Sequence, residues 1–282
     1  MNKILLAACI FFSLNACNNT SENKSETKSD STKTFHLGGS SQITIGTTDL
    51  IKSQEFYELL GFKKVEDIPN GIQMSDESVL ILLQKSDKKI LRLSYFDADA
   101  DKIANAVEQK GFHFVVKNEN TGFITRSIFN GPDSIQFSLV KLDAANIYKP
   151  KKKMIGISQD GLKDVKNYPN PCCGVFGEFS FPVVNVDSSI SQLKKLGFSG
   201  DKMTMPYPWA MMSDSLLAIG LHQQTIWKYP ALTFFAPDMK EKIEKLKAKG
   251  LVFTDFPGMG GGPGNQVLIS PEGVHIFLFS WM

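Results

Sequence analysis

Leu60-Gly61-Phe62 recurs as Leu196-Gly197-Phe198, and this repeated stretch decides how the chain is divided. A second phrase repeats downstream of each copy, where Met74-Ser75-Asp76 and Met212-Ser213-Asp214 both precede an apolar run. Repeats of solenoid proteins are roughly 20 to 50 residues long, and this period is far longer. The repeat therefore predicts two copies of one domain.

Each copy itself divides into two similar units that run strand, helix, strand, strand, strand. In the first unit, residues 42–48 alternate in strand fashion, and Asp49 then opens a helix. The other units contain expected helices at 99–110, 187–196 and 238–249, and the last has Asp238 and Glu241 at capping-box spacing. Four such units predict an α+β fold in two tandem domains.

The N-terminus has the pattern of an export signal. Lys3 precedes an apolar stretch, Ile4 to Leu14, which is too short to span a bilayer. The stretch ends in Leu14-Asn15-Ala16-Cys17, which resembles a bacterial lipobox. That resemblance implies a lipoprotein signal peptide at 1–16 and a lipid-modified Cys17. The alternative is an ordinary secretory signal with a chance cysteine.

Residues 17–36 are expected to be a disordered tether from the lipidated cysteine. The segment is rich in Asn, Ser, Thr, Lys and Glu, so it has little apolar surface to bury. We expect the folded part to be held at the cell envelope, facing the periplasm or the cell surface. Asn18 favours the outer membrane over the inner one under the usual sorting rule.

Length and charge set the remaining frame. The chain has 282 residues and a net charge of +2, and we assign domains to 37–141 and 176–282 with a linker at 142–175. The dense basic run, Lys149 with Lys151, Lys152 and Lys153, lies in the linker, and we interpret it as a solvated segment rather than a nucleic-acid site. Cys172 and Cys173 are either small residues at a domain entrance or a redox switch.

Together these phrases resemble the vicinal oxygen chelate (VOC) superfamily, which includes glyoxalase I, bleomycin-resistance proteins and extradiol dioxygenases. The resemblance rests on residues 45–50 leading to Leu60-Gly61-Phe62, on Phe181-Pro182-Val183 leading to Leu196-Gly197-Phe198, and on Ser270-Pro271-Glu272-Gly273. It implies that the two βαβββ units of each domain form a curved, half-open, barrel-like mixed sheet with the helices outside. It also implies one cavity in each domain.

Catalytic members of this superfamily bind a divalent metal through His, Glu or Gln on three strands of that cavity. By offset we place these positions on Gln42, Arg92 and Ser138 in the first copy, and on Ser180, Ala231 and Phe277 in the second. Arginine, alanine and phenylalanine are not metal ligands. We therefore expect no complete metal triad and no cofactor, and Gln42, His222 and His275 are the remaining candidates for metal ligands.

Other side chains are candidates for ligand binding. His275 and Phe277 share one face of the last strand, as do their counterparts Gln136 and Ser138, and His275 is the candidate general base. Arg92 either clamps a carboxylate or caps the sheet rim. The alternative for His275 is a half-buried, structural histidine.

A run of soft and aromatic residues in the second copy includes Trp209 and is followed by Trp227 and Tyr229. These groups either line an apolar ligand pocket or belong to the core. The glycines of 258–264 are interpreted as a lid or a surface loop, not as a phosphate loop.

Two functions follow from this reading. The first is a metal-independent, lipid-anchored protein that binds a small apolar or aromatic molecule, as in the bleomycin-resistance branch. The alternative is a glyoxalase-like lyase or another metal-dependent VOC enzyme with unusual ligands among Gln42, Gln136, His222 and His275. A third option is a structural lipoprotein whose cavities are filled by side chains.

Overall fold

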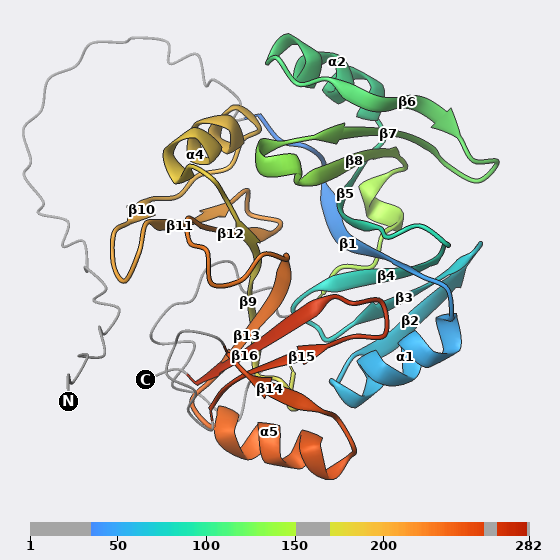
Figure 1. The fold of residues 1–282 in the computed structure, drawn as a ribbon. Helices are drawn as coiled ribbons and strands as arrows, with labels where there is room; N and C mark the ends of the chain where they lie inside the picture. The colour runs from blue at the N-terminus through green and yellow to red at the C-terminus, as the bar shows by residue number, and fades with distance from the viewer. Residues whose placement is uncertain (1–34, 151–169, 257–263, 281–282) are drawn as a thin grey trace, which may run out of the picture.

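A computed structural model describes residues 35–150, 170–256 and 264–280, and the chain forms two eight-stranded sheets in these ranges. The first sheet has the order β2-β3-β4-β1-β5-β8-β7-β6, and the second repeats it as β10-β11-β12-β9-β13-β16-β15-β14. Both sheets mix parallel and antiparallel pairs and stay open at their edges. The tandem α+β prediction is therefore confirmed (Figure 1).

The elements of the first domain follow the expected order of two units. They are β1 (Ser40–Thr47), α1 (Leu50–Leu59), β2 (Lys63–Ile68), β3 (Gly71–Ser75), β4 (Leu80–Lys85), β5 (Leu91–Asp97), α2 (Ala100–Gln109), β6 (Phe114–Asn120), β7 (Thr125–Asn130), the 3-10 turn η1 (Pro132–Ser134) and β8 (Gln136–Lys141), followed by the 3-10 turn η2 (Ala144–Asn146).

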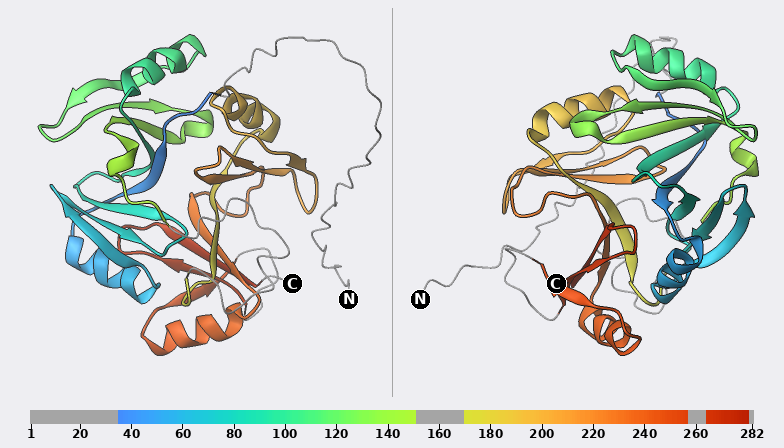
Figure 2. Two further views of the ribbon diagram at one scale, coloured as in Figure 1. Left: turned by 180° about the vertical axis from the view of Figure 1, so that it is seen from behind. Right: turned by 45° about the vertical axis from the view of Figure 1, so that its right-hand side comes forward.

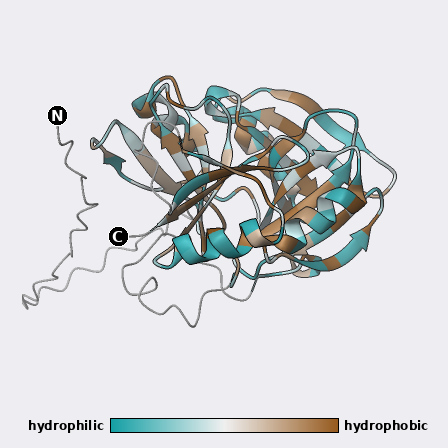
Figure 3. Ribbon diagram, turned by 60° about the horizontal axis from the view of Figure 1, so that its bottom comes forward, coloured by the Kyte–Doolittle hydropathy of each residue, from teal (hydrophilic) through white to brown (hydrophobic). Residues whose placement is uncertain are grey.

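The second domain repeats this order. Its elements are β9 (Val175–Pro182), α4 (Val186–Lys195), β10 (Lys202–Met203), β11 (Trp209–Ser213), β12 (Ala218–His222), β13 (Ala231–Ala236), α5 (Met239–Ala248), β14 (Phe253–Asp255), β15 (Asn265–Ile269) and β16 (His275–Ser280). Each helix packs on the sheet of its own unit, and the helices alternate polar and apolar residues along their length (Figure 3).

The helix starts differ in two respects from the expectation. Asp49 caps α1 as predicted, because its carboxylate accepts a hydrogen bond from the backbone N–H of Lys52 at 3.1 Å. Helix α4 is instead capped by Asn185, two residues before the aspartate that we expected to open it. The expected capping box at Asp238 is absent from the structure, where Asp238 forms an ion pair with Lys242 at 3.4 Å.

The repeated Leu-Gly-Phe stretch ends α1 and α4 in the same way. Gly61 and Gly197 both have φ of +91°, a left-handed conformation that side-chain-bearing residues rarely adopt. The chain then turns so that Phe62 and Phe198 point into the protein interior, where both are buried. The stretch is thus a helix stop followed by a core residue.

Each of these two phenylalanines packs against the other domain. The ring of Phe62 lies 6.4 Å from that of Phe234 on β13, and the ring of Phe198 lies 6.3 Å from that of Phe137 on β8, both centroid to centroid. The buried apolar residues of the two domains accordingly form one continuous core. Stability of either domain is therefore coupled to the other.

The helices show the same reciprocal arrangement in every view. Helices α2 and α4 lie at one end of the molecule, and α1 and α5 at the other (Figure 2). At the first end, Ser189 of α4 donates a hydrogen bond to Asp133 Oδ2 at 2.6 Å. At the second, Ser53 of α1 donates one to Glu272. Each domain's first helix is thus held by the turn before the other domain's last strand.

The described parts of the expected linker are packed rather than free. Asn170 is fully buried, and its side-chain amide donates to the backbone oxygen of Leu60 at 2.9 Å and to Asp76 Oδ2 at 3.2 Å. Its carbonyl accepts from the backbone N–H groups of Cys172 and Cys173. Both cysteines are free thiols, so no disulfide joins them.

Several expected features lie outside the described residues: the signal peptide, Cys17, the tether up to residue 34, Lys151 to Lys153 and most of the glycine-rich loop. Within the ranges that the structure describes, no helix is both long and apolar enough to cross a membrane.

Candidate functional site

The face of the second sheet that points away from its helices carries two rows of side chains. In the first row, Thr233 of β13 pairs with Glu178 on β9 and with Phe277 on β16. In the next row, Ala231 pairs with Ser180 and His275. Because side chains alternate between faces along a strand, all these residues share this inner face.

A buried carboxylate and an imidazole meet on this face. Oε1 of Glu178 lies 2.7 Å from Nε2 of His222, and the two side chains are only 5% and 12% exposed. The hydroxyl of Ser180 donates to the same Oε1 at 2.6 Å and is itself 2.6 Å from the hydroxyl of Thr233. Oε1 of Glu178 is thus held by the Ser180 hydroxyl, which Thr233 supports, and by His222.

The second carboxylate oxygen of Glu178 has no hydrogen-bond partner within the described ranges, although it is buried. Buried polar atoms are nearly always paired, and an ionised carboxylate oxygen is among the most costly to leave alone. Space for this carboxylate comes from Gly220 on β12, because a Cβ atom at that position would overlap it. The unpaired oxygen marks the place where a cation or a proton donor would be stabilised.

Aromatic rings enclose His222. The hydroxyl of Tyr207 lies 3.1 Å from Nδ1, the ring of Trp209 stacks on the imidazole at 5.9 Å with an interplanar angle of 2°, and the ring of Trp227 lies 5.4 Å away. Burial, with the nearby charge of Glu178 in second place, raises the pKa of Tyr207 to about 12, so this phenol stays protonated at neutral pH. The rings limit the access of water to one side of the imidazole.

The remaining candidates of the second domain lie beside this cluster. Phe277 packs against Trp227 at 5.2 Å and against Phe256 at 4.9 Å. His275 shares the face of Phe277, as expected, and packs on the ring of Tyr229 at 5.3 Å. Burial lowers the pKa of His275. No hydrogen bond of its side chain is found in the described part of the chain, and it does not touch Glu178.

The structure corrects the assignment of equivalent positions in the two copies. Gln42 pairs with Ser94 on β5 just as Glu178 pairs with Thr233, so the counterpart of Gln42 is Glu178 and not Ser180. Offsets differ along the repeat: the Leu-Gly-Phe phrases are 196 − 60 = 136 residues apart, and 42 + 136 = 178. The offset between the two Leu-Gly-Phe phrases therefore identifies Glu178 as the counterpart of Gln42.

The expected middle-strand position in the first domain is also one row away from the correct residue. Ser94, not Arg92, lies in line with Gln42 and Ser138, because Arg92 pairs with Thr44 and Gln136 one row away. The hydrogen bond between the hydroxyls of Thr44 and Ser94, at 2.9 Å, repeats that between Ser180 and Thr233. This shared contact fixes the alignment of the two inner faces.

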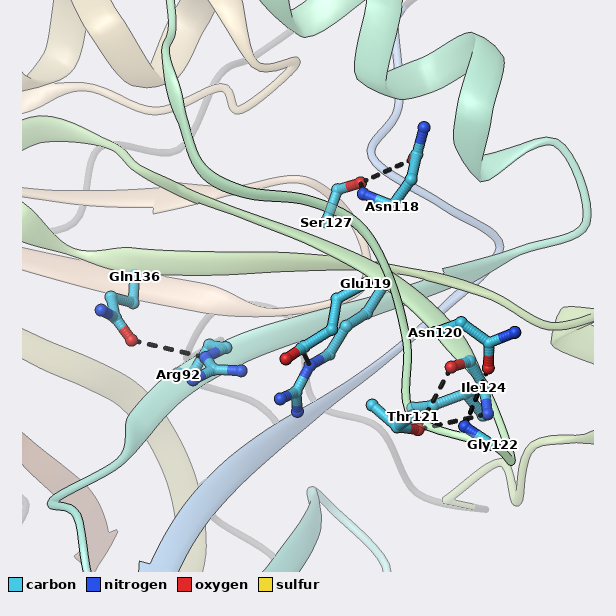
Figure 4. Close-up of polar contacts among 10 residues, drawn as sticks. Arg92, Asn118, Glu119, Asn120, Thr121, Gly122, Ile124, Ser127 and Gln136 are labelled. Atoms are coloured by element: carbon cyan, nitrogen blue, oxygen red, sulfur yellow. Dashed lines mark hydrogen bonds and ion pairs between the residues drawn. The ribbon is translucent and has the colours of Figure 1, made fainter.

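The inner face of the first domain is polar but carries no carboxylate at these positions. The carbonyl oxygen of Gln42 accepts a hydrogen bond from the amide of Gln73 at 2.9 Å, and both residues are buried. Ser138 is buried on the same face, and Nε of Arg92 donates to Gln136 (Figure 4). Amides, hydroxyls and one guanidinium make this face a poor metal site.

Of the two inner faces, that of the second domain therefore carries the better metal donors. No group of three or more His, Cys, Asp or Glu side chains is close enough to hold a metal within the described residues. Glu178 and His222 form a pair of donors, and the last-strand position that a third donor would need is Phe277. The pair supplies one carboxylate and one imidazole, which suit zinc, nickel, manganese or iron.

Comparison with known proteins places the fold. No family model matches the sequence, and no curated protein matches it. A mutant homoprotocatechuate 2,3-dioxygenase from Brevibacterium fuscum is 14% identical, with a TM-score of 0.58 over 91% of this chain and 75% of that chain. The homoprotocatechuate 2,3-dioxygenase of Arthrobacter globiformis is 16% identical, with a TM-score of 0.56 over 88% of this chain and 81% of that chain.

A catechol 2,3-dioxygenase is 13% identical, with a TM-score of 0.53 over 87% of both chains. All three are extradiol dioxygenases built from VOC domains. This chain has the VOC fold. The resemblance drawn from the repeated phrases is thereby confirmed for the VOC domains, while at these identities the likeness concerns the fold alone.

The same comparison corrects two expectations. We expected a metal-independent VOC binding protein of the bleomycin-resistance type and no cofactor. The structural neighbours are metal-dependent VOC dioxygenases, and this finding overturns both expectations.

Proposed function

We propose that this protein is a metal-dependent VOC enzyme that acts on a small molecule, with its reactive centre at Glu178 and His222 in the second domain. The observation that carries the proposal is the buried, unpaired Oε2 of Glu178, a carboxylate whose other oxygen, Oε1, lies 2.7 Å from Nε2 of His222. The likeness to extradiol dioxygenases supports oxygen-dependent cleavage of a catechol ring as the reaction class to test first.

The residues fit a divalent metal held by two protein side chains. Glu178 has one oxygen that accepts from Ser180 and one that is free to bind a cation. His222 would bind through Nε2, deprotonated and released from its 2.7 Å contact with Oε1 of Glu178. Its Nδ1 would keep the hydrogen bond to Tyr207, the kind of outer contact that commonly orients a ligating histidine. With two protein donors instead of three, more coordination positions are left for water and substrate.

The protein's own groups have separate tasks in this proposal. A bound divalent metal would supply a Lewis acid that polarises a substrate oxygen. Ser180 and Thr233 hold the Glu178 carboxylate in one orientation. Trp209 and Trp227 shield His222 from water and offer flat apolar surfaces against which an aromatic substrate can pack.

Metal titration of the purified full chain tests the donors directly. We expect the apo protein to take up one equivalent of Mn²⁺ or anaerobic Fe²⁺ by calorimetry, with elemental analysis confirming the ratio. Glu178→Gln and His222→Gln should each weaken binding at least about tenfold. Gln42→Ala is the matched control, because it changes the equivalent sheet position of the first domain and should leave metal affinity unchanged.

Oxygen uptake with catechol then tests the reaction class. The metal-loaded wild type should consume oxygen, and both ligand variants should lose this activity while Gln42→Ala retains it. Absence of metal binding by the wild type, or equal binding by Glu178→Gln, would show the metal proposal to be wrong. Metal binding without oxygen uptake would reject only the dioxygenase class.

We also propose that lipidated Cys17 anchors this enzyme in the cell envelope, on the strength of the lipobox-like sequence. Cells given a labelled fatty acid should label the wild type and not Cys17→Ala, and only the wild type should fractionate with membranes. Equal labelling of both proteins would exclude lipidation of Cys17.

A further inference from the structure

The chain contains only two arginines, Arg92 and Arg126, and both lie in the second unit of the first domain. Arg126 is paired, since its Nε lies 2.6 Å from Oε2 of Glu119. Arg92 is not paired with any carboxylate in the described part of the chain. Its one hydrogen bond there is from Nε to Oε1 of Gln136, at 3.4 Å, and leaves the two terminal nitrogens without a partner (Figure 4).

Arg92 is also buried, with 7% of its surface exposed. The side chains beside it in its own row and the adjacent row are neutral: the hydroxyls of Thr44, Ser94 and Ser138 and the amide of Gln136. The ion pair of Arg126 and Glu119 lies on the same face, on β7 and β6. Burial lowers the pKa of Arg92 to about 10; the charge of Arg126 acts in the same direction, and that of Glu119 acts against it. Glu119 is already paired with Arg126, so Arg92 has no ion-pair partner of its own within the described residues. A buried charge in this situation is costly, and the position therefore favours an anion.

We propose that the inner face of the first domain binds a small organic carboxylate, with Arg92 as the residue that holds the carboxylate group. The planar guanidinium presents parallel N–H groups that match the two oxygens of a carboxylate. A singly charged group is favoured over phosphate, because one unpaired cation can neutralise one negative charge and a dianion would leave a buried excess. The surrounding hydroxyls and amides complete the polar environment.

This site is independent of the proposed metal centre. It lies in the other domain, and the position equivalent to Arg92 in the second domain is Ala231, which carries no charge. Loss of metal binding would therefore leave the carboxylate proposal standing, and the reverse also holds.

Calorimetry on the full chain, with benzoate as probe, tests the site. We expect saturable binding of one benzoate per chain, and at least a tenfold loss in both Arg92→Met and Arg92→Lys. The lysine variant keeps the charge but lacks the planar fork, so it separates recognition from folding. Unliganded Arg92→Met should be at least as stable as the wild type, because an unpaired buried charge has been removed.

Three controls decide between outcomes. Benzamide, which has the same ring without the charge, should not bind, and inorganic phosphate should bind more weakly than benzoate. Lys102→Met removes an exposed cation on α2 and should bind benzoate like the wild type. The proposal is overturned if benzoate does not saturate, if Arg92→Met binds it equally well, or if benzamide or phosphate binds as tightly.

Discussion

The carboxylate of Glu178 lies directly over Gly220, in a space that only the absence of a side chain provides. Gly220 is on β12, which pairs with β9, the strand that carries Glu178. Strand β12 ends in His222. The glycine therefore allows the carboxylate to turn toward the imidazole instead of away from the sheet.

Gly220→Ala should displace this carboxylate. We expect a loss of about 1–3 kcal/mol in the free energy of unfolding, as for overpacked cores, together with weaker metal binding. The double variant Gly220→Ala with Glu178→Ala removes the overlap. Its loss in the free energy of unfolding should therefore be smaller than the sum of the losses in the two single variants. Chemical denaturation measures all three proteins, and additive effects would contradict the overlap.

Removal of the Ser189 hydroxyl should loosen the two domains. The hydroxyl is buried and donates to Asp133 of the other domain, so Ser189→Ala leaves a carboxylate oxygen with one partner fewer. We expect a loss of about 1–3 kcal/mol. Ser188→Ala, one residue away on the exposed side of α4, should stay within about 0.5 kcal/mol of the wild type. Calorimetric unfolding of both variants gives the comparison.

Asn170 is expected to anchor the end of the linker. Its side chain makes four hydrogen bonds, to Leu60, Asp76, Cys172 and Cys173, and none of its surface is exposed. Asn170→Ala should therefore cost about 2–4 kcal/mol. Denaturation at neutral pH measures this loss, and a change below about 0.5 kcal/mol would contradict the anchoring role.

The lowered pKa of His275 predicts a dependence of stability on pH. The folded state binds the proton less readily than the unfolded state, whose pKa is about 6.5. Stability should therefore decrease as the pH falls below about 6.5, and solvent screening of this partly exposed group keeps the loss small. His275→Gln, which copies the equivalent Gln136, should flatten this part of the curve. Thermal unfolding from pH 5 to 8 tests the difference.

Much of the fold could be predicted because its signals are local. The backbone at positions 61 and 197 is left-handed, a conformation that favours glycine. Asp76 and Asp214 each accept hydrogen bonds from the backbone N–H groups two and three residues later in the chain. A short stretch of chain decides such turns by itself. Their recurrence at matching places was enough to predict two copies of two units.

The candidate site was only partly predictable. Strand alternation placed Ser180, His275 and Phe277 on the inner face, because a shift of two residues leaves the face unchanged. The same shift moves a side chain to another row, and so Glu178 was missed while Ser180 was put in its place. Thr233 was missed as well, since it belongs to no repeated phrase. Tyr207 belongs to the soft and aromatic run around Trp209, but nothing in that run predicts its contact with His222.

By itself the sequence determined the domain repeat, the helix stops and the inward faces of the strands, which depend on backbone preferences of neighbouring residues. Only the tertiary structure decided that Glu178 meets His222, 222 − 178 = 44 residues away, and that Phe62 packs on Phe234 of the other domain. These contacts depend on strand register and domain packing, which arise from the summed burial of many side chains rather than from any short stretch.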